Sequence, residues 1–197
     1  MLATYSKRLA AALIVVATLS LTAGSSVTVA QTAENEPQSA PLVAARDYLQ
    51  ATGFRARFEA KFPDMVQSKI ALKILVEREP ILENEVAKIY AGNFTVEELR
   101  DASKFYSTST GTMYFNFNVE MNTNPLVTPE IYRSEVAKRF SSQQRAEIFA
   151  FSSTAVGQKM ARLVPSLAKI IKNAAEQWGR ETQQVIDRAV RAGEGVS

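Results

Sequence analysis

The sequence predicts an all-α fold, a closed helical bundle that follows an N-terminal signal peptide. Apolar residues recur at helical spacing through most of the chain after residue 40, and prolines and glycines stand where helices begin and end. One sequence motif, which contains a hydroxyl residue suited to cap a helix and a glycine, occurs twice, and its two copies are 46 residues apart. We expect about seven to nine helices in one domain, residues 41–197, with two αα-hairpin copies at about 94–121 and 140–167. Two copies are too few for a solenoid, which favours a closed bundle.

Residues 1–30 have the pattern of a secretory signal peptide. Two basic residues precede the uncharged run Leu9–Leu21, and small residues follow it. Ala30 is the best cleavage position, and Ala23 competes with it. A retained membrane anchor is the alternative, but the apolar run is shorter than the roughly 20 residues that a spanning helix needs. We therefore expect an exported protein, with no stable membrane span once the signal is removed.

The composition excludes several functions. The net charge of +3 falls to +1 when residues 1–30 are removed, because they hold two basic residues and no acidic ones. A near-neutral chain lacks the basic stripe that nucleic-acid binding requires. The chain has no cysteine and no histidine, which excludes disulfides, cysteine- or histidine-based catalysis and the usual zinc sites. We predict no cofactor, no metal and no catalytic residue.

The first elements after the signal are a spacer and a helix. Residues 31–40 are polar and have no periodicity, which predicts a flexible spacer. Pro41 begins a helical segment that ends near Gly53, a suitable C′ residue. A second helical segment carries three phenylalanines, Phe54, Phe58 and Phe62.

Two prolines predict the next two helix starts. Pro63 and Pro80 suit the first turns of helices over residues 64–79 and 81–90. Gly92 follows the second of these stretches and is expected to end it.

Each copy of the repeated motif begins with a capping box. A hydroxyl followed three residues later by Glu or Gln lets the two residues satisfy each other's backbone amides at a helix start. A phenylalanine precedes each box. The residues are Phe94, Thr95 and Glu98 in the first copy and Phe140, Ser141 and Gln144 in the second.

The second half of each copy predicts a tight joint between two helices. A phenylalanine lies near the end of the first helix, and a threonine caps the second. A glycine at N3 is unfavourable for helix propensity, so its expected role is to let the helices approach closely. The residues are Phe105, Thr108 and Gly111, and then Phe151, Thr154 and Gly157. We expect the phenylalanines to pack across the joints.

One stretch between the copies is ambiguous. Residues 115–122 alternate apolar and polar side chains, as a strand does. Met113, Phe117 and Met121 also lie four residues apart, on one helical face, so we predict a helix. Thr128 is a good N-cap for another helix that follows.

The C-terminal segment, from about 155 to 192, predicts a long amphipathic helix. Pro165 lies within it and is expected to kink or split it. Basic residues opposite the apolar stripe would suit an anionic membrane, but acidic residues dilute them, so we favour closure of the bundle. The stripe consists of Met160, Val164, Leu167, Ile171, Ala174, Trp178, Val185 and Ala189.

The repeated motif resembles the signature of a bacterial family of exported helical proteins, domain of unknown function 2059. The matching residues are Thr95, Glu98, Leu99, Phe105, Tyr106, Thr108 and Gly111, and in the second copy Phe151, Thr154, Gly157 and Pro165. Ser109 and Ala155 stand where the family favours proline, and Val119 where it has a second one. The resemblance covers about residues 90–170 and implies a periplasmic or secreted all-α domain. It implies no activity, because the family has none assigned.

The polar residues near the first joint allow an enzymatic alternative. A nucleophilic Ser107 or Thr108 would need activation by a lysine such as Lys104, with a strongly depressed pKa. Glu97 and Glu98 form a carboxylate pair. Hydroxyls and carboxylates at a helix start usually stabilise its first turn, so we favour that structural role.

Aromatic residues suggest a possible binding surface formed by Tyr114, Phe115, Phe117 and Met121. Core packing is the default expectation for this group, but the three aromatic side chains cannot all point to one face of a helix, so part of it is expected to be exposed. We therefore predict a non-enzymatic envelope protein that binds an unknown envelope protein or an apolar ligand. The alternative is a hydrolase that uses a lysine-activated hydroxyl or a carboxylate pair.

Overall fold

The computed structural model describes residues 39–66 and 68–194. The predicted signal peptide, residues 1–30, and most of the predicted spacer lie outside the described residues. Within the described ranges the chain forms helices and no strand, so the predicted all-α bundle is confirmed. The helices are α2 (Ala40–Ala51), α3 (Phe54–Glu59), α4 (Phe62–Met65), α5 (Lys69–Ala91), α6 (Val96–Tyr106), α7 (Ser109–Thr123), α8 (Pro129–Arg139), α9 (Ser142–Ser152) and α10 (Ala155–Glu194).

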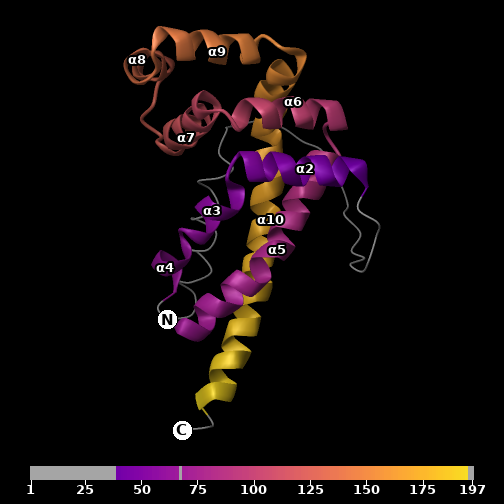
Figure 1. Ribbon diagram of the computed structural model, residues 1–197. Helices are drawn as coiled ribbons and strands as arrows, with labels where there is room; N and C mark the ends of the chain where they lie inside the picture. Colours follow the sequence, from indigo (N-terminus) through magenta and orange to yellow (C-terminus); the bar gives the residue numbers. More distant parts are fainter. Residues whose placement is uncertain (1–38, 67, 195–197) are drawn as a thin grey trace.

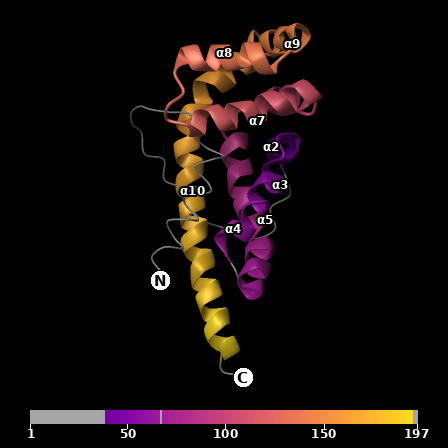
Figure 2. The ribbon, with the colours of Figure 1, turned by 90° about the vertical axis from the view of Figure 1, so that its left-hand side faces the viewer.

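Two long helices form the frame of the molecule. α5 and α10 run antiparallel beside each other, and α2 and α6 cross them near one end (Figure 1). α7, α8 and α9 stack beyond that crossing, at the end where α10 begins (Figure 2). At the opposite end, the last turns of α10 extend past the start of α5. The bundle is therefore elongated.

The apolar side chains form two clusters. The larger one joins α2 to α6 with α9 and α10, and its most deeply buried large members are Phe54, Phe58, Phe62, Leu75, Leu82 and Leu99. The smaller one lies among α7, α8 and α9 and consists of Phe117, Met121, Phe140 and Ile148. Phe105 packs against both clusters and so links them.

Several predicted helix boundaries are confirmed. Gly53 follows α2 with φ of 65°, a left-handed conformation that glycine adopts at little cost. Residues 113–122 are helical and belong to α7. Thr128 caps α8 by accepting a hydrogen bond from the Ile131 amide at 3.3 Å.

The helix predicted over residues 64–79 is wrong in its first part. The chain makes only the short α4 after Pro63 and then leaves the helical conformation at Val66. Ser68 caps the following helix, with its hydroxyl 3.5 Å from the Ala71 amide nitrogen. A new N-cap three residues before the apolar stripe sets the start of α5.

The helix start predicted at Pro80 is also wrong, because α5 continues through this residue. A proline inside a helix removes one hydrogen bond and costs about 3 kcal/mol. On both sides of it α5 buries large side chains completely, Leu75 before it and Leu82 and Val86 after it. Each of these contributes about 1.5–3 kcal/mol when buried, so burial of the continuous stripe outweighs the proline.

α10 is one helix and is not split at Pro165. It packs along α5, as the favoured interpretation expected. Trp178 Nε1 donates to the Arg78 carbonyl at 2.8 Å, and Arg78 Nε donates to the Thr182 hydroxyl at 3.0 Å. These bonds fix the register of the two long helices. No helix in the described part of the chain is long and apolar enough to span a membrane.

Up to Trp178, the predicted apolar stripe of α10 is correct at Met160, Leu167, Ile171 and Trp178, but Val164 and Ala174 are only half-buried and Ala175 is buried instead. Beyond Trp178 the buried positions include Thr182 and Ile186, whereas the predicted Val185 and Ala189 are only half-buried. The bond from Arg78 lets the threonine hydroxyl occupy a core position, which apolar periodicity alone does not foresee.

Candidate functional site

The two copies begin with the same local geometry. Thr95 and Glu98 form a capping box, with amide-to-side-chain distances of 2.8 and 3.2 Å. Ser141 and Gln144 form the second box, at 2.9 and 3.2 Å. Each box uses side chains to satisfy amides that the first turn of a helix leaves free, and so fixes where α6 and α9 begin.

The threonine hydroxyl at each of the two joints donates one hydrogen bond to the backbone and accepts another from it. Thr108 Oγ1 accepts from the Gly111 amide at 2.9 Å and donates to the Phe105 carbonyl at 2.8 Å. In the second joint Thr154 Oγ1 accepts at 3.0 Å and donates at 2.6 Å to the equivalent groups. Each threonine therefore ties the end of one helix to the start of the next.

The glycines of the joints have no room for a side chain. A Cβ atom at Gly111 would overlap the Phe105 carbonyl oxygen and lie 2.8 Å from the Cα of Tyr106. At Gly157 it would overlap the Phe151 carbonyl oxygen and lie 2.9 Å from the Cα of Ser152. The close approach of the two helices thus depends on glycine at both positions.

The two joints meet through their phenylalanines. The rings of Phe105 and Phe151 stack with their centroids 4.1 Å apart and an interplanar angle of 5°. Tyr106 packs edge-on against Phe151 at 5.4 Å. Aromatic residues from hairpins far apart in sequence therefore form one contact.

Two of the groups considered for a lysine-activated hydroxyl at the first joint have structural partners. Lys104 Nζ pairs with Asp101 at 2.8 Å, while the Thr108 hydroxyl is bound to the backbone. Glu98 also bonds Lys159 Nζ, at 2.6 Å. Although burial alone would raise the pKa of Glu98, the hydrogen bonds from Lys159 and the Thr95 amide lower it. This carboxylate is held ionised in a contact between α6 and α10.

The predicted binding surface is not a single exposed surface. Phe117 and Met121 are buried in the smaller apolar cluster, and Tyr114 and Phe115 are half-buried. Helical spacing correctly groups Phe117 and Met121, but it does not reveal that α8 and α9 cover that face. The side chain of Phe115 instead reaches toward α3, where Arg57 lies over its ring at 4.2 Å.

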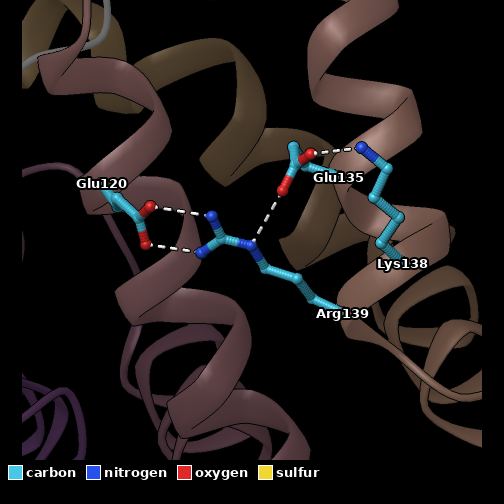
Figure 3. A network of polar contacts seen from close by, with 4 residues as sticks. All are labelled: Glu120, Glu135, Lys138 and Arg139. Carbon is cyan, nitrogen blue, oxygen red and sulfur yellow. Dashed lines mark hydrogen bonds and ion pairs between the residues drawn. The ribbon is translucent and has the colours of Figure 1, made fainter.

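A polar network holds α8 to α7 beside this cluster. Arg139 donates two hydrogen bonds to the Glu120 carboxylate, at 2.6 and 2.9 Å, and a third to Glu135 at 3.1 Å (Figure 3). Lys138 also donates to Glu135, at 2.9 Å. The hydrogen bond from Arg139 lowers the pKa of Glu120. The paired geometry is the one in which arginine binds a carboxylate most specifically.

A buried carboxylate on α5 was not anticipated. Glu79 is completely buried, and neither of its oxygens accepts a hydrogen bond from the described residues. Its nearest cation is Arg55, whose Nε lies 3.5 Å away and also bonds Glu59 at 2.9 Å. Burial, together with repulsion from Glu83, raises the pKa of Glu79 to about 7. Apolar periodicity assigns only apolar residues to the buried face, so a buried carboxylate has no local sequence signal.

Two hollows lie near α3. The larger is an open groove of about 430 Å³ among α2, α3 and α5, and its charged and polar walls include Arg46, Asp47, Gln50, Arg55, Glu59 and Glu83. The smaller is a cavity of about 20 Å³ bounded by Tyr48, Tyr90, Arg57 and Phe115 among others. Neither was predicted, because each combines residues from helices that are distant in sequence.

The fold and the joints define an all-α protein built on capped helical hairpins. The model of the family described as "uncharacterized protein conserved in bacteria (DUF2059)" matches residues 81–114 and 132–184 of the chain. These segments contain both joints, so the resemblance predicted from the sequence is confirmed for this part of the chain. No curated protein and no solved structure matches the chain.

Proposed function

We propose that this protein is exported to the bacterial envelope and acts there by binding a partner protein, without catalysis of its own. The pattern of residues 1–30 supports export. The engagement of Thr108, Lys104 and Glu98 in structural contacts supports a binding role over the hydrolase considered above.

The observation that carries the proposal is a set of exposed aliphatic side chains on the first half of α5. Their exposed fractions lie between 37% and 46%, and the residues are Ile70, Leu72, Val76 and Ile81. Leu72 and Val76 are one helical turn apart, and Ile70 and Ile81 are three turns apart, so each pair shares one flank of the helix. We take the neighbouring pair Leu72 and Val76 as the contact site, because adjacent exposed apolar side chains are where proteins bind one another, and Ile70 and Ile81 lie on the opposite flank.

A protein partner fits better than an apolar ligand. The groove beside α3 has charged walls, and the smaller cavity holds no more than a water-sized molecule. Apolar ligands require larger pockets lined mainly by apolar side chains. The apolar flanks of α5 are open and extended, which suits a contact with another protein.

Site-specific photo-crosslinking in bacterial cells tests the proposal. A crosslinking amino acid at position 72 or 76 should yield a discrete adduct in the envelope fraction. The same group at Ile131 of α8, which is 44% exposed, is the matched control and should yield none. The binding proposal fails if positions 72 and 76 give no adduct, and the export proposal fails if the protein stays in the cytoplasm with residues 1–30 attached.

A further inference from the structure

Helix α10 has an exposed face on which every charged residue is basic. Between residues 162 and 191, the acidic residues of this helix are half-buried, whereas all but one of the basic residues are exposed. The other exposed residues of this stretch are polar and uncharged, apart from Ile170. The exposed cations, here called the basic row, are Arg162, Lys169, Arg180, Arg188 and Arg191.

The three acidic residues of the same stretch lie at the edges of this face and have partners of their own. Glu176 pairs with Lys172 of the same helix at 3.8 Å, and Glu181 pairs with Arg78 of α5 at 3.7 Å. Asp187 accepts a hydrogen bond of 2.7 Å from a glutamine one turn earlier. The acidic residues that the sequence led us to expect as a dilution of the basic face are therefore set aside from it.

The basic row is not neutralised by the protein. Among the described residues, no carboxylate forms an ion pair with any of its five cations, and Arg188 Nε donates only to the Gln184 carbonyl, at 3.2 Å. Elsewhere, a cation as exposed as Lys104 pairs with an acidic neighbour, Asp101, at 2.8 Å. The positive charge of the row is thus open to an external anion.

The basic row is straight and long. Lys169, Arg180 and Arg191 follow one another at intervals of 11 residues, which is close to three full turns of an α-helix. From Arg162 to Arg191 the row spans about 43 Å, at a rise of about 1.5 Å per residue. α5 packs along one side of α10, and the opposite side faces away from the other described helices over most of its length (Figure 2). The row therefore lies on an outer edge of the molecule, where a flat surface can reach it.

A membrane of anionic lipids fits the basic row better than a rigid anionic polymer. The intervals between the five cations are uneven, so they match no fixed repeat of charges. Lipid phosphates move within the bilayer and can gather beneath each cation. Ser166, Asn173, Gln177 and Gln184 lie between the cations and can donate hydrogen bonds to phosphate oxygens. Ile170, which is 42% exposed, can enter the boundary between headgroups and acyl chains.

We infer that α10 lies along an anionic membrane surface and holds the protein there through the basic row. Each Lys or Arg close to such a surface strengthens binding roughly fivefold. The apolar stripe of α10 stays in the core of the bundle, so the contact is peripheral and involves only the outer side of the helix. The inference rests on the proposed export, which supplies the membrane, and it is independent of the partner site at Leu72 and Val76.

Co-sedimentation with lipid vesicles tests this surface. The protein is used without residues 1–30, so that the apolar run Leu9–Leu21 cannot contribute, and this form keeps every described helix. Vesicles that contain phosphatidylglycerol should bind it at low salt, whereas vesicles of phosphatidylcholine alone should not. High salt should release it, because mobile ions screen exposed charges.

Three outcomes of this test overturn the inference. They are equal binding to both kinds of vesicle, binding that high salt leaves unchanged, and binding to the soluble polyanion dextran sulfate but to no vesicle. Each concerns purified protein and lipid alone, so a negative result leaves the crosslinking and export results unaffected.

A variant without three of the cations locates the contact. Lys169→Gln, Arg180→Gln and Arg191→Gln together should weaken binding to the anionic vesicles about a hundredfold, since each lost cation accounts for roughly fivefold. All three side chains are exposed, and glutamine suits a helix.

The matched control removes the same charge from exposed positions of α6 and α8. Arg100→Gln, Lys104→Gln and Arg133→Gln together give the same net charge and should bind the vesicles as the wild type does. Equal losses in the two triple variants would show that net charge alone governs binding and would overturn the role of α10.

A fluorescent label measures the contact directly if the α10 variant fails to fold. The chain has no cysteine, so Asn173→Cys gives a single attachment point within the basic row. An environment-sensitive dye at this position should shift its emission to the blue when anionic vesicles are added. The same dye at Glu77→Cys, an exposed position of α5, should not respond. No shift at position 173, or equal shifts at both positions, would overturn the inference.

Discussion

Phe105 and Phe151 stack almost in parallel, with ring centroids 4.1 Å apart, although 46 residues separate them in the chain. Each lies at the joint of a different hairpin, and Phe105 also contacts both apolar clusters. The ring pair is therefore the point at which the two hairpins and the two clusters meet.

A double-mutant cycle on this pair should reveal coupling between the joints. Phe105→Leu and Phe151→Leu should each lower the free energy of unfolding, and the double variant should lose about 0.5–1.5 kcal/mol less than the sum, because the stack is lost only once. Urea unfolding measures all three variants. Phe62→Leu, in the distant α4, should add its effect independently to that of Phe105→Leu. Additivity at 105 and 151 would contradict the prediction.

Alanine at either joint glycine should be strongly destabilising. A methyl group at Gly111 or Gly157 overlaps a carbonyl oxygen, so the helices must separate, at a cost of about 3 kcal/mol or more in the free energy of unfolding. Gly92→Ala is the matched control, because a Cβ there lies at an ordinary 3.4 Å from the nearest atom. Chemical denaturation of the three variants should separate the two joint positions from the control, and equal effects would contradict the steric explanation.

Removal of the joint hydroxyls should affect stability. Thr108→Ala and Thr154→Ala each lose an N-cap, which should lower the free energy of unfolding by about 1 kcal/mol. Ser107→Ala, one residue away in an exposed position, should change it by less than about 0.5 kcal/mol. Unfolding curves measured side by side decide the comparison. Equal losses for Ser107→Ala and Thr108→Ala would show that the cap is not the cause.

Glu79 should make the stability depend on pH in a defined window. Its pKa is about 7 in the folded protein and about 4.5 when unperturbed, so between these values the folded state holds more protons than the unfolded state. The contribution of Glu79 to stability is therefore fully present below pH 4.5 and is lost as the pH rises through 7. Glu79→Gln should remove this loss and be more stable than the wild type at pH 8, by about 2–3 kcal/mol, with little difference at pH 4.

Unfolding measured across this pH range, with Glu77→Gln as the control, checks the Glu79 prediction. Glu77 is an exposed neighbour that pairs with Lys73 at 3.7 Å, and its variant should follow the wild type. A constant difference between Glu79→Gln and the wild type at all pH values would contradict the assigned titration.

The sequence predicted the joints well because their physics is local. A capping hydroxyl, its N3 partner and a glycine act within a few residues of one another, and the structure has each hydrogen bond at the expected atoms. Pro80 failed as a helix start because burial along α5 involves contacts with α2 and α10, which no local rule includes. Phe117 was predicted to belong to an exposed surface, but it is buried for the same reason, because α8 and α9 cover it.

The surroundings of Arg57 and the apolar flanks of α5 could not be predicted from the sequence. Arg57 meets Phe115 across 58 positions, and the cavity between them exists only once α2, α5 and α7 are in place. The residues next to Arg57 in the sequence give no sign that its Nε and Nη2 atoms will be buried without a carboxylate partner. The apolar flanks of α5 likewise emerge only when the helices that cover its other sides are known.

The two glycine joints have a consequence for how proteins of this kind are compared across genomes. The carbonyl oxygens of Phe105 and Phe151 occupy the space that a methyl group would need, so any chain that forms this joint must keep glycine whatever its biological role. Glycine at these positions therefore carries information on architecture and none on role. A match to the motif in another sequence predicts the same joint between two helices, but it does not predict what that protein does.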